Sequence, residues 1–263
     1  MVQANETEGK ETLWQKFDNW VWYSRQSQFE FQVNQYVGCY KGRNEAGLRF
    51  RRILALAITL WMILPYYNDI VDVNSNPLKD IRFFTNWGRY FTWFALVAGS
   101  FVKPSEPEQN VNSPWKAWKW YTILFHIGLS MEMVIVPFYW VLLNNKSRYS
   151  SAIPTYKIIL GIGDHTLMLV LLLLDFATNC VPLCYRHFII YAAVNSIYMV
   201  VNFVVTKVTG KPIYTPLSWN SPLSYMMPLF ILIGMILIIL LLRKLTEIKL
   251  KKYDCEHFLT SLY

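Results

Sequence analysis

A small set of polar residues stands inside the long apolar stretches of this 263-residue chain. Such side chains are costly in hydrocarbon, so they mark either functional sites or contacts between helices. The set consists of Thr85, Asn86, Arg89, His126, Glu132, Asp164, His165, Asp175, Asn195 and Asn202. Any chemistry has to be sought among them, because the chain contains no GxSxG, HExxH, GxGxxG or Walker motif.

The charged members of the set are expected to pair. An Arg89 or a Glu132 left alone in hydrocarbon would cost several kcal/mol, so we predict that these two residues contact each other. Their pair is either a structural lock between two helices or a support that holds Thr85 and the neighbouring histidine. Asp164 and His165 are adjacent and point about 100° apart on one helix. If His165 acts as a base, its orienting partner must therefore come from another helix, with Glu132 as the best candidate. For His126, a plain hydrogen bond to a neighbouring helix is the competing explanation.

The composition indicates which elements carry these residues. Hydrophobic residues make up 54% of the chain and charged residues 16%, whereas a soluble domain has about 25% charged residues. About twenty apolar residues are needed to cross a bilayer as a helix. We therefore predict an all-α, polytopic membrane protein with about six transmembrane helices, over approximately 52–67, 83–102, 117–143, 156–178, 188–208 and 222–242.

The distribution of Lys and Arg favours cytosolic positions for both termini, by the positive-inside rule. We expect a cytosolic, partly interfacial, aromatic-rich segment over 1–51, a six-span domain over 52–243 and a basic cytosolic tail over 244–263. The net charge of +8 is spread between the helices, so membrane lipids, rather than nucleic acid, are the expected partners. Plasma membrane and endomembrane are not distinguished, and the oligomeric state is left open. We expect no cofactor and no metal, since Cys180 and Cys184 lack further ligands at zinc-site spacing.

Counting 1.5 Å of rise per residue gives an expected depth for each group. Thr85 falls about 3 Å from the outer boundary, whereas His165 falls about 14 Å from it. Most of the polar groups occupy the outer half of the bilayer. Asp175 is expected near the inner face, within reach of Arg186 or His187.

Three segments resemble one family. FFTNWGRYF, over 83–91, resembles the F-x-T-N-W start of a span in the Rolling stone proteins, relatives of the androgen-induced and androgen-dependent membrane hydrolases. GDHTLMLVLLLLDF, over 163–176, is similar to a family helix with a histidine followed by an aspartate. KPIYTPLSWNSP, over 211–222, resembles the loop before the final span. The likeness covers about 52–242 in order. The chain departs from the family at Arg89, at Asp164 and at Ser218, where an acidic residue is common.

The resemblance implies a function. The androgen-induced branch hydrolyses lipid esters in which a fatty acid is esterified to a hydroxy fatty acid, with an intramembrane threonine and a histidine. By this resemblance Thr85 would be the nucleophile and His165 the base, with Asn86 or Arg89 stabilising the oxyanion. The Rolling stone branch itself is associated with cell fusion.

Three other hypotheses remain open. The first is a non-enzymatic protein of membrane organisation, adhesion or fusion, in which the polar residues only lock helices together. The second is a haem b protein with His126 and His165 as axial ligands. The third is a transporter, with helices broken at Pro65 and Pro137 and a charged substrate bound at Arg89 or Asp164.

Overall fold

The computed structural model describes residues 12–13, 44–71, 82–102, 117–143, 155–179, 181 and 187–252. Nearly all of these residues are helical, as the apolar runs predict. Most of the aromatic-rich segment expected over 1–51 lies outside the described residues, but its last eight residues are the start of the first long helix.

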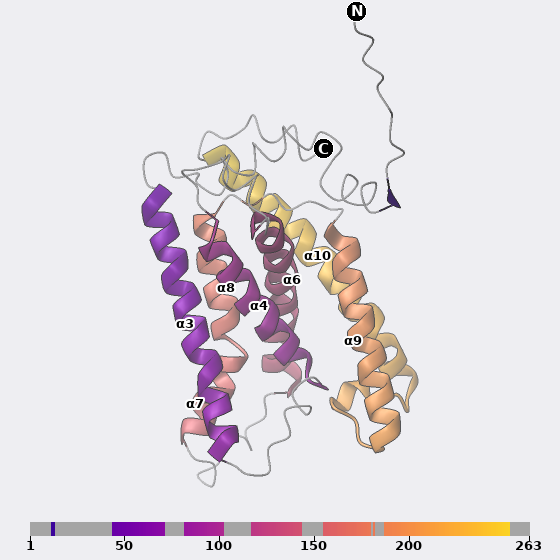
Figure 1. The fold of residues 1–263 in the computed structure, drawn as a ribbon. Helices are drawn as coiled ribbons and strands as arrows, with labels where there is room; N and C mark the ends of the chain where they lie inside the picture. Colours follow the sequence, from indigo (N-terminus) through magenta and orange to yellow (C-terminus); the bar gives the residue numbers. More distant parts are fainter. Residues whose placement is uncertain are drawn as a thin grey trace, which may run out of the picture.

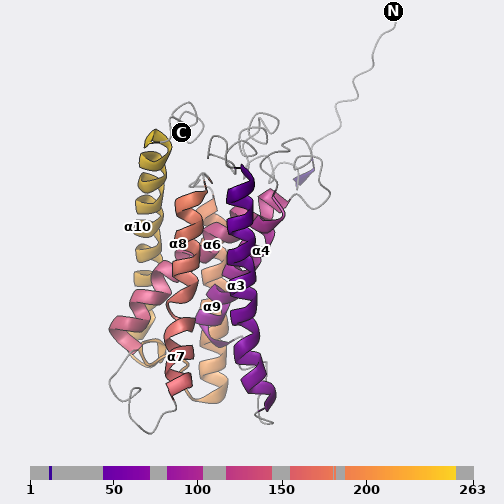
Figure 2. The same cartoon turned by 90° about the vertical axis from the view of Figure 1, so that its left-hand side faces the viewer.

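The helices pack side by side as a bundle (Figures 1 and 2). In chain order they are α3 (Asn44–Val71), α4 (Phe84–Ser100), α6 (Ala117–Phe138) with the π-helical turn η2 (Tyr139–Leu143), α7 (Thr155–Asp164), α8 (Leu167–Thr178), α9 (His187–Thr209), the 3-10 turn η4 (Thr215–Leu217) and α10 (Pro222–Lys252). Among the described residues, four helical stretches are long and apolar enough to cross a membrane. These are Ala117–Val141, Ile158–Thr178, Ile189–Thr209 and Pro222–Lys249.

The first two predicted spans, within α3 and α4, do not belong to those four stretches. α4 has 17 residues and contains the polar Asn86 and Arg89, and α3 has arginines in its first third. Both helices nevertheless lie against the apolar ones, α4 on α6 and α3 on α4 and α8 (Figures 1 and 2). Large apolar side chains of α3, such as Ile53, Leu56 and Leu60, stay exposed on the outside of the bundle.

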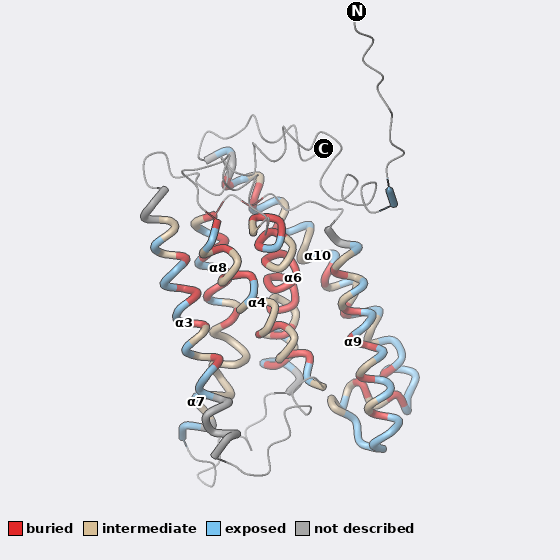
Figure 3. Tube along the Cα trace, viewed as in Figure 1, coloured by how far each residue is buried: buried red, intermediate tan, exposed pale blue. Residues whose placement is uncertain are grey.

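α6 is the central helix, with buried residues around most of its circumference (Figure 3). α10 differs, because large apolar residues along its length remain exposed, among them Leu229, Phe230, Ile233 and Leu237. A helix that is apolar on its exposed face is more stable in contact with lipid than with water. The start of α3 and the end of α10 lie at one end of the bundle, and the start of α4 and the end of α9 lie toward the other (Figures 1 and 2).

A buried polar cluster joins α3, α6 and α8. Arg51 Nε and Asp175 Oδ1 are 2.9 Å apart, and their side chains are 2% and 0% exposed. The Tyr121 hydroxyl donates to the second carboxylate oxygen of Asp175, and Asn179 Nδ2 donates to the Tyr121 hydroxyl at 3.0 Å. The partner of Asp175 is therefore Arg51. We expected Arg186 or His187, but the first lies outside the described residues, as does the side chain of the second.

We predict that Asp175→Asn destabilises the fold strongly, because it removes the buried carboxylate charge that lies 2.9 Å from Arg51 Nε. The free energy of unfolding should fall by about 3–5 kcal/mol, measured by denaturant titration in detergent micelles. The double change Arg51→Met with Asp175→Leu should recover much of that loss. Glu247→Gln is the control, since Glu247 pairs with Arg243 and Lys244 on the surface of α10 and its loss should cost about 0.5 kcal/mol. Equal losses in the two single variants would contradict the prediction.

Candidate active site

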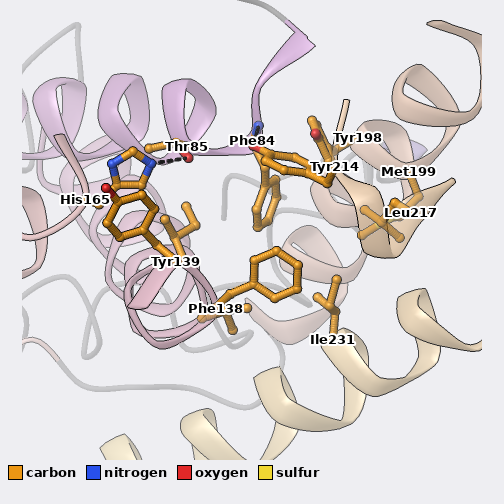
Figure 4. Close-up of a pocket in the computed structure, with 12 residues that line it drawn as sticks. Phe84, Thr85, Phe138, Tyr139, His165, Tyr198, Met199, Tyr214, Leu217 and Ile231 are labelled. Atoms are coloured by element: carbon orange, nitrogen blue, oxygen red, sulfur yellow. Dashed lines mark hydrogen bonds between the residues drawn. The ribbon is translucent and has the colours of Figure 1, made fainter. Parts of the chain in front are cut away.

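Thr85 and His165 meet. The Thr85 hydroxyl in the first turn of α4 lies 3.5 Å from Nε2 of His165, which stands between α7 and α8 (Figure 4). Thr85 is buried and His165 is half-buried. This distance is at the long end of a hydrogen bond, as is common for catalytic pairs in the absence of substrate.

From the helix rise per residue, we predicted depths in the membrane for Thr85 and His165 that differ by about 10 Å. That prediction assumed that the spans begin at one level, and the assumption is wrong for α4. Its 17 residues give a length of only about 25 Å. α4 begins above the lower ends of α3 and α9 in Figure 1. The short helix therefore brings Thr85 to the depth of His165.

A break between two helical segments orients His165. α7 ends at Asp164 and α8 begins at Leu167. The backbone N–H of His165 donates to the carbonyl of Ile162 at 3.3 Å, three residues back, instead of to the carbonyl of Gly161. The Gly161 carbonyl is thereby free to accept from the side chain, and His165 Nδ1 lies 2.7 Å from it.

The hydrogen bond to Gly161 decides the tautomer of His165. A carbonyl oxygen can only accept, so Nδ1 carries a proton and, in the neutral ring, Nε2 carries the lone pair. That lone pair faces the Thr85 hydroxyl. The orienting partner is thus a carbonyl of the histidine's own helical segment, and the expectation that Glu132 plays this role is wrong.

The Tyr139 ring fixes the plane of the imidazole. The two ring centroids are 3.6 Å apart and the planes differ by 16°. Tyr139 is the first residue of η2, which follows Pro137 near the end of α6. Proline disrupts regular α-helical hydrogen bonding, and π-turns are frequent near functional sites.

Asp164 ties the break to two other helices. Its Oδ1 accepts from Trp61 Nε1 of α3 at 2.9 Å and lies 3.5 Å from Arg89 Nη1 of α4. Arg89 therefore pairs with Asp164, whereas we predicted Glu132. Gly163 permits the approach of α3, because a Cβ there would overlap the Trp61 ring.

The remaining predicted site residues do not contact the Thr85–His165 pair directly. Glu132 is fully buried against Gly88 of α4, and its carboxylate has no hydrogen-bond partner among the described residues. Asn86 and Arg89, the expected oxyanion donors, do not line the pocket described below. The His126 ring does not line it either, and both nitrogens of His165 already face partners. The geometry therefore gives no support to haem ligation by these two histidines.

A pocket opens beside the Thr85–His165 pair (Figure 4). It is a narrow cleft, whose empty space amounts to about 400 Å³ only when its open mouth is counted. Most of its wall is apolar, and it is lined by Phe84, Thr85, Val134, Ile135, Phe138, Tyr139, His165, Tyr198, Met199, Tyr214, Leu217 and Ile231. The sequence predicts no role for Gly161 or for the three tyrosines of the pocket wall, Tyr139, Tyr198 and Tyr214. Tyr214 could have been noticed, because it stands in the segment that resembles the family's final loop.

No protein-family model matches the chain, and neither a curated protein nor a solved structure matches it. The likeness to the Rolling stone proteins therefore depends on the three quoted segments.

We predict opposite effects for two neighbouring glycines of α7. Gly163→Ala should lower the free energy of unfolding by about 1–3 kcal/mol, because its Cβ overlaps the Trp61 ring. Gly161→Ala meets nothing within 4 Å and should be neutral or stabilising by up to about 1 kcal/mol. Thermal unfolding in detergent, followed by tryptophan fluorescence, measures both. A Gly163→Ala protein as stable as the wild type would show that Trp61 does not hold the break closed.

Proposed function

We propose that this protein is an intramembrane hydrolase of lipid esters, with Thr85 as nucleophile and His165 as general base. The observation that carries the proposal is the Thr85 hydroxyl facing the unprotonated Nε2 of His165 at the edge of an apolar pocket. A threonine hydroxyl is a weak nucleophile until an adjacent base takes its proton.

The pair can perform both halves of ester hydrolysis. In the first half, Thr85 Oγ1 bonds to the ester carbonyl carbon while its proton passes to His165 Nε2. The carbonyl π pair moves onto oxygen, then returns as the alkoxide leaves and takes the proton from His165. In the second half, water attacks the acyl-threonine, again with His165 as base, and releases the acid and free Thr85.

The pocket supports a lipid as substrate. Phe138, Met199 and Ile231 give its wall the character of a site for a hydrocarbon chain. Thr85 and His165 lie at one side of the pocket, and Met199, Leu217 and Ile231 at the other (Figure 4). An acyl chain would extend from the scissile ester toward these three residues. Its wall comes from membrane-type helices, so we expect entry from the bilayer.

The proposed arrangement in the membrane has six spans, with α7 and α8 forming one. The packing of α3 and α4 against the four apolar stretches supports this number. The start of α3 and the end of α10 share one end of the bundle (Figure 1), as an even number of crossings requires. With that end in the cytosol, the site occupies the outer half of the bilayer. We also propose that the chain is a relative of the Rolling stone proteins within the androgen-induced hydrolase group.

We predict that a fluorophosphonate probe labels the detergent-purified protein, and that Thr85→Ala and His165→Ala each abolish labelling. Thr85→Ser should retain it, since a hydroxyl remains. Thr92→Ala is the matched control, because Thr92 is a buried threonine two turns further along α4 and does not line the pocket. Its hydroxyl has no hydrogen-bond partner among the described residues, so its loss should not affect labelling.

Labelling that survives Thr85→Ala would contradict the nucleophile assignment. A folded wild type without labelling or esterase activity would favour the non-enzymatic hypothesis, in which the polar residues only hold helices together. Thermal unfolding of each variant distinguishes lost chemistry from lost structure.

We predict that Ile231→Trp shifts substrate preference toward short chains, because the larger side chain fills the end of the pocket. The ratio of kcat/KM for 4-nitrophenyl octanoate to that for the palmitate should rise about tenfold or more. Ile233→Trp is the control, since Ile233 is exposed on the outside of the same helix. If both variants change the ratio equally, the acyl chain does not occupy this pocket.

A further inference from the structure

The Tyr214 hydroxyl lies at the start of α4, beside the proposed nucleophile. The backbone N–H of Phe84 donates to the Tyr214 oxygen at 3.0 Å. The Thr85 side chain is near enough to the phenol to affect its titration. In Figure 4, Tyr214 and His165 lie on opposite sides of Thr85. Thr85 thus has a base on one side and a phenol on the other.

The loop between α9 and α10 holds Tyr214 in this position. Its ring meets the edges of Phe83 and Phe138, with centroids 6.4 and 6.2 Å apart. The same loop is fixed at Trp219, whose Nε1 donates to Asn202 Oδ1 at 2.8 Å. The carbonyl of Trp219 accepts from the Tyr225 hydroxyl at 2.9 Å. Trp219 itself has a φ of 56°, a left-handed conformation that these contacts hold in place.

The proposed reaction needs a donor at this place. As Thr85 attacks, negative charge develops on the ester carbonyl oxygen, and hydrogen-bond donors directed at that oxygen lower the barrier. The donors expected from the sequence, Asn86 and Arg89, do not line the pocket. Tyr214 does line it and carries an O–H group.

The Tyr214 phenol is in the correct state to donate. Burial raises its pKa above the ordinary value, and hydrogen bonds with the Thr85 side chain and with the backbone of Phe84 and Thr85 oppose this only in part. The phenol is therefore protonated at neutral pH.

We propose that Tyr214 is a catalytic residue that donates its hydroxyl hydrogen bond to the carbonyl oxygen of the ester while Thr85 attacks the carbon. This inference rests on the proposed hydrolase function. When substrate arrives, the phenol directs its hydroxyl hydrogen to the substrate carbonyl, and the Phe84 N–H continues to hold the phenol oxygen. No proton leaves Tyr214, because the proton of Thr85 goes to His165 and then to the leaving alkoxide.

The test compares two hydroxyl deletions on the same loop region. Tyr214→Phe should lower kcat for 4-nitrophenyl octanoate about a hundredfold, with little change in KM and in unfolding temperature. Tyr225→Phe removes an anchor of the loop outside the pocket and should lower kcat far less than Tyr214→Phe does. Fluorophosphonate labelling should slow in parallel with kcat, because that reaction also places charge on an oxygen beside Thr85.

The outcomes separate this inference from the function on which it rests. Wild-type kcat in Tyr214→Phe, together with an inactive Thr85→Ala, would overturn the role of Tyr214 and keep the hydrolase. Equal losses in Tyr214→Phe and Tyr225→Phe, or a change in KM alone, would assign the phenol to loop docking and overturn its catalytic role. Absence of hydrolysis in the folded wild type would overturn the hydrolase and the role of Tyr214 together.

Discussion

The site depends on one backbone carbonyl, that of Gly161, which the break between α7 and α8 releases from its helical hydrogen bond. In an unbroken helix this carbonyl would accept from the N–H of His165. Here it accepts from the imidazole instead, so the break fixes both the tautomer and the direction of His165. Neighbouring helices hold this break in place beside α4. They do so at Asp164, which forms an ion pair with Arg89 and accepts a hydrogen bond from Trp61.

Two charge pairs join the helices of the bundle at different places. Arg51 with Asp175 joins helices at the end where α3 begins, and Arg89 with Asp164 joins them near the pocket. The Arg51–Asp175 pair has short, direct contacts and further hydrogen bonds to Asp175. The Arg89–Asp164 pair is longer and borders the site. The difference fits their positions. The Arg51–Asp175 pair joins helices inside the bundle and needs close contact, whereas the Arg89–Asp164 pair only has to keep the segment beside the site in place.

The apolar runs predict three of the four long membrane-type helices to within two residues at each end, because length and hydropathy largely determine them. The fourth was predicted to end at residue 242, whereas the apolar stretch continues to Lys249. The pairing of Thr85 with His165 follows from resemblance, and a depth count argued against it. The choice of Asp164 rather than Glu132 as the partner of Arg89 was beyond the sequence, because it depends on helix rotation and on where α4 begins. The sequence also does not predict the helix break at His165, because no proline lies there.

The length of α4 relates the site to the surrounding lipid. In the proposed six-span arrangement α4 crosses the bilayer, and its length of about 25 Å is less than a hydrocarbon core of about 30 Å. Lipids next to a helix that is too short draw their headgroups inward, so the bilayer becomes thinner there. Thinning on the side of the first turn brings the aqueous phase closer to Thr85. Membranes of different thickness would then hydrate the same residues to different extents, and the lipid composition of the host membrane would govern the access of water to this part of the protein.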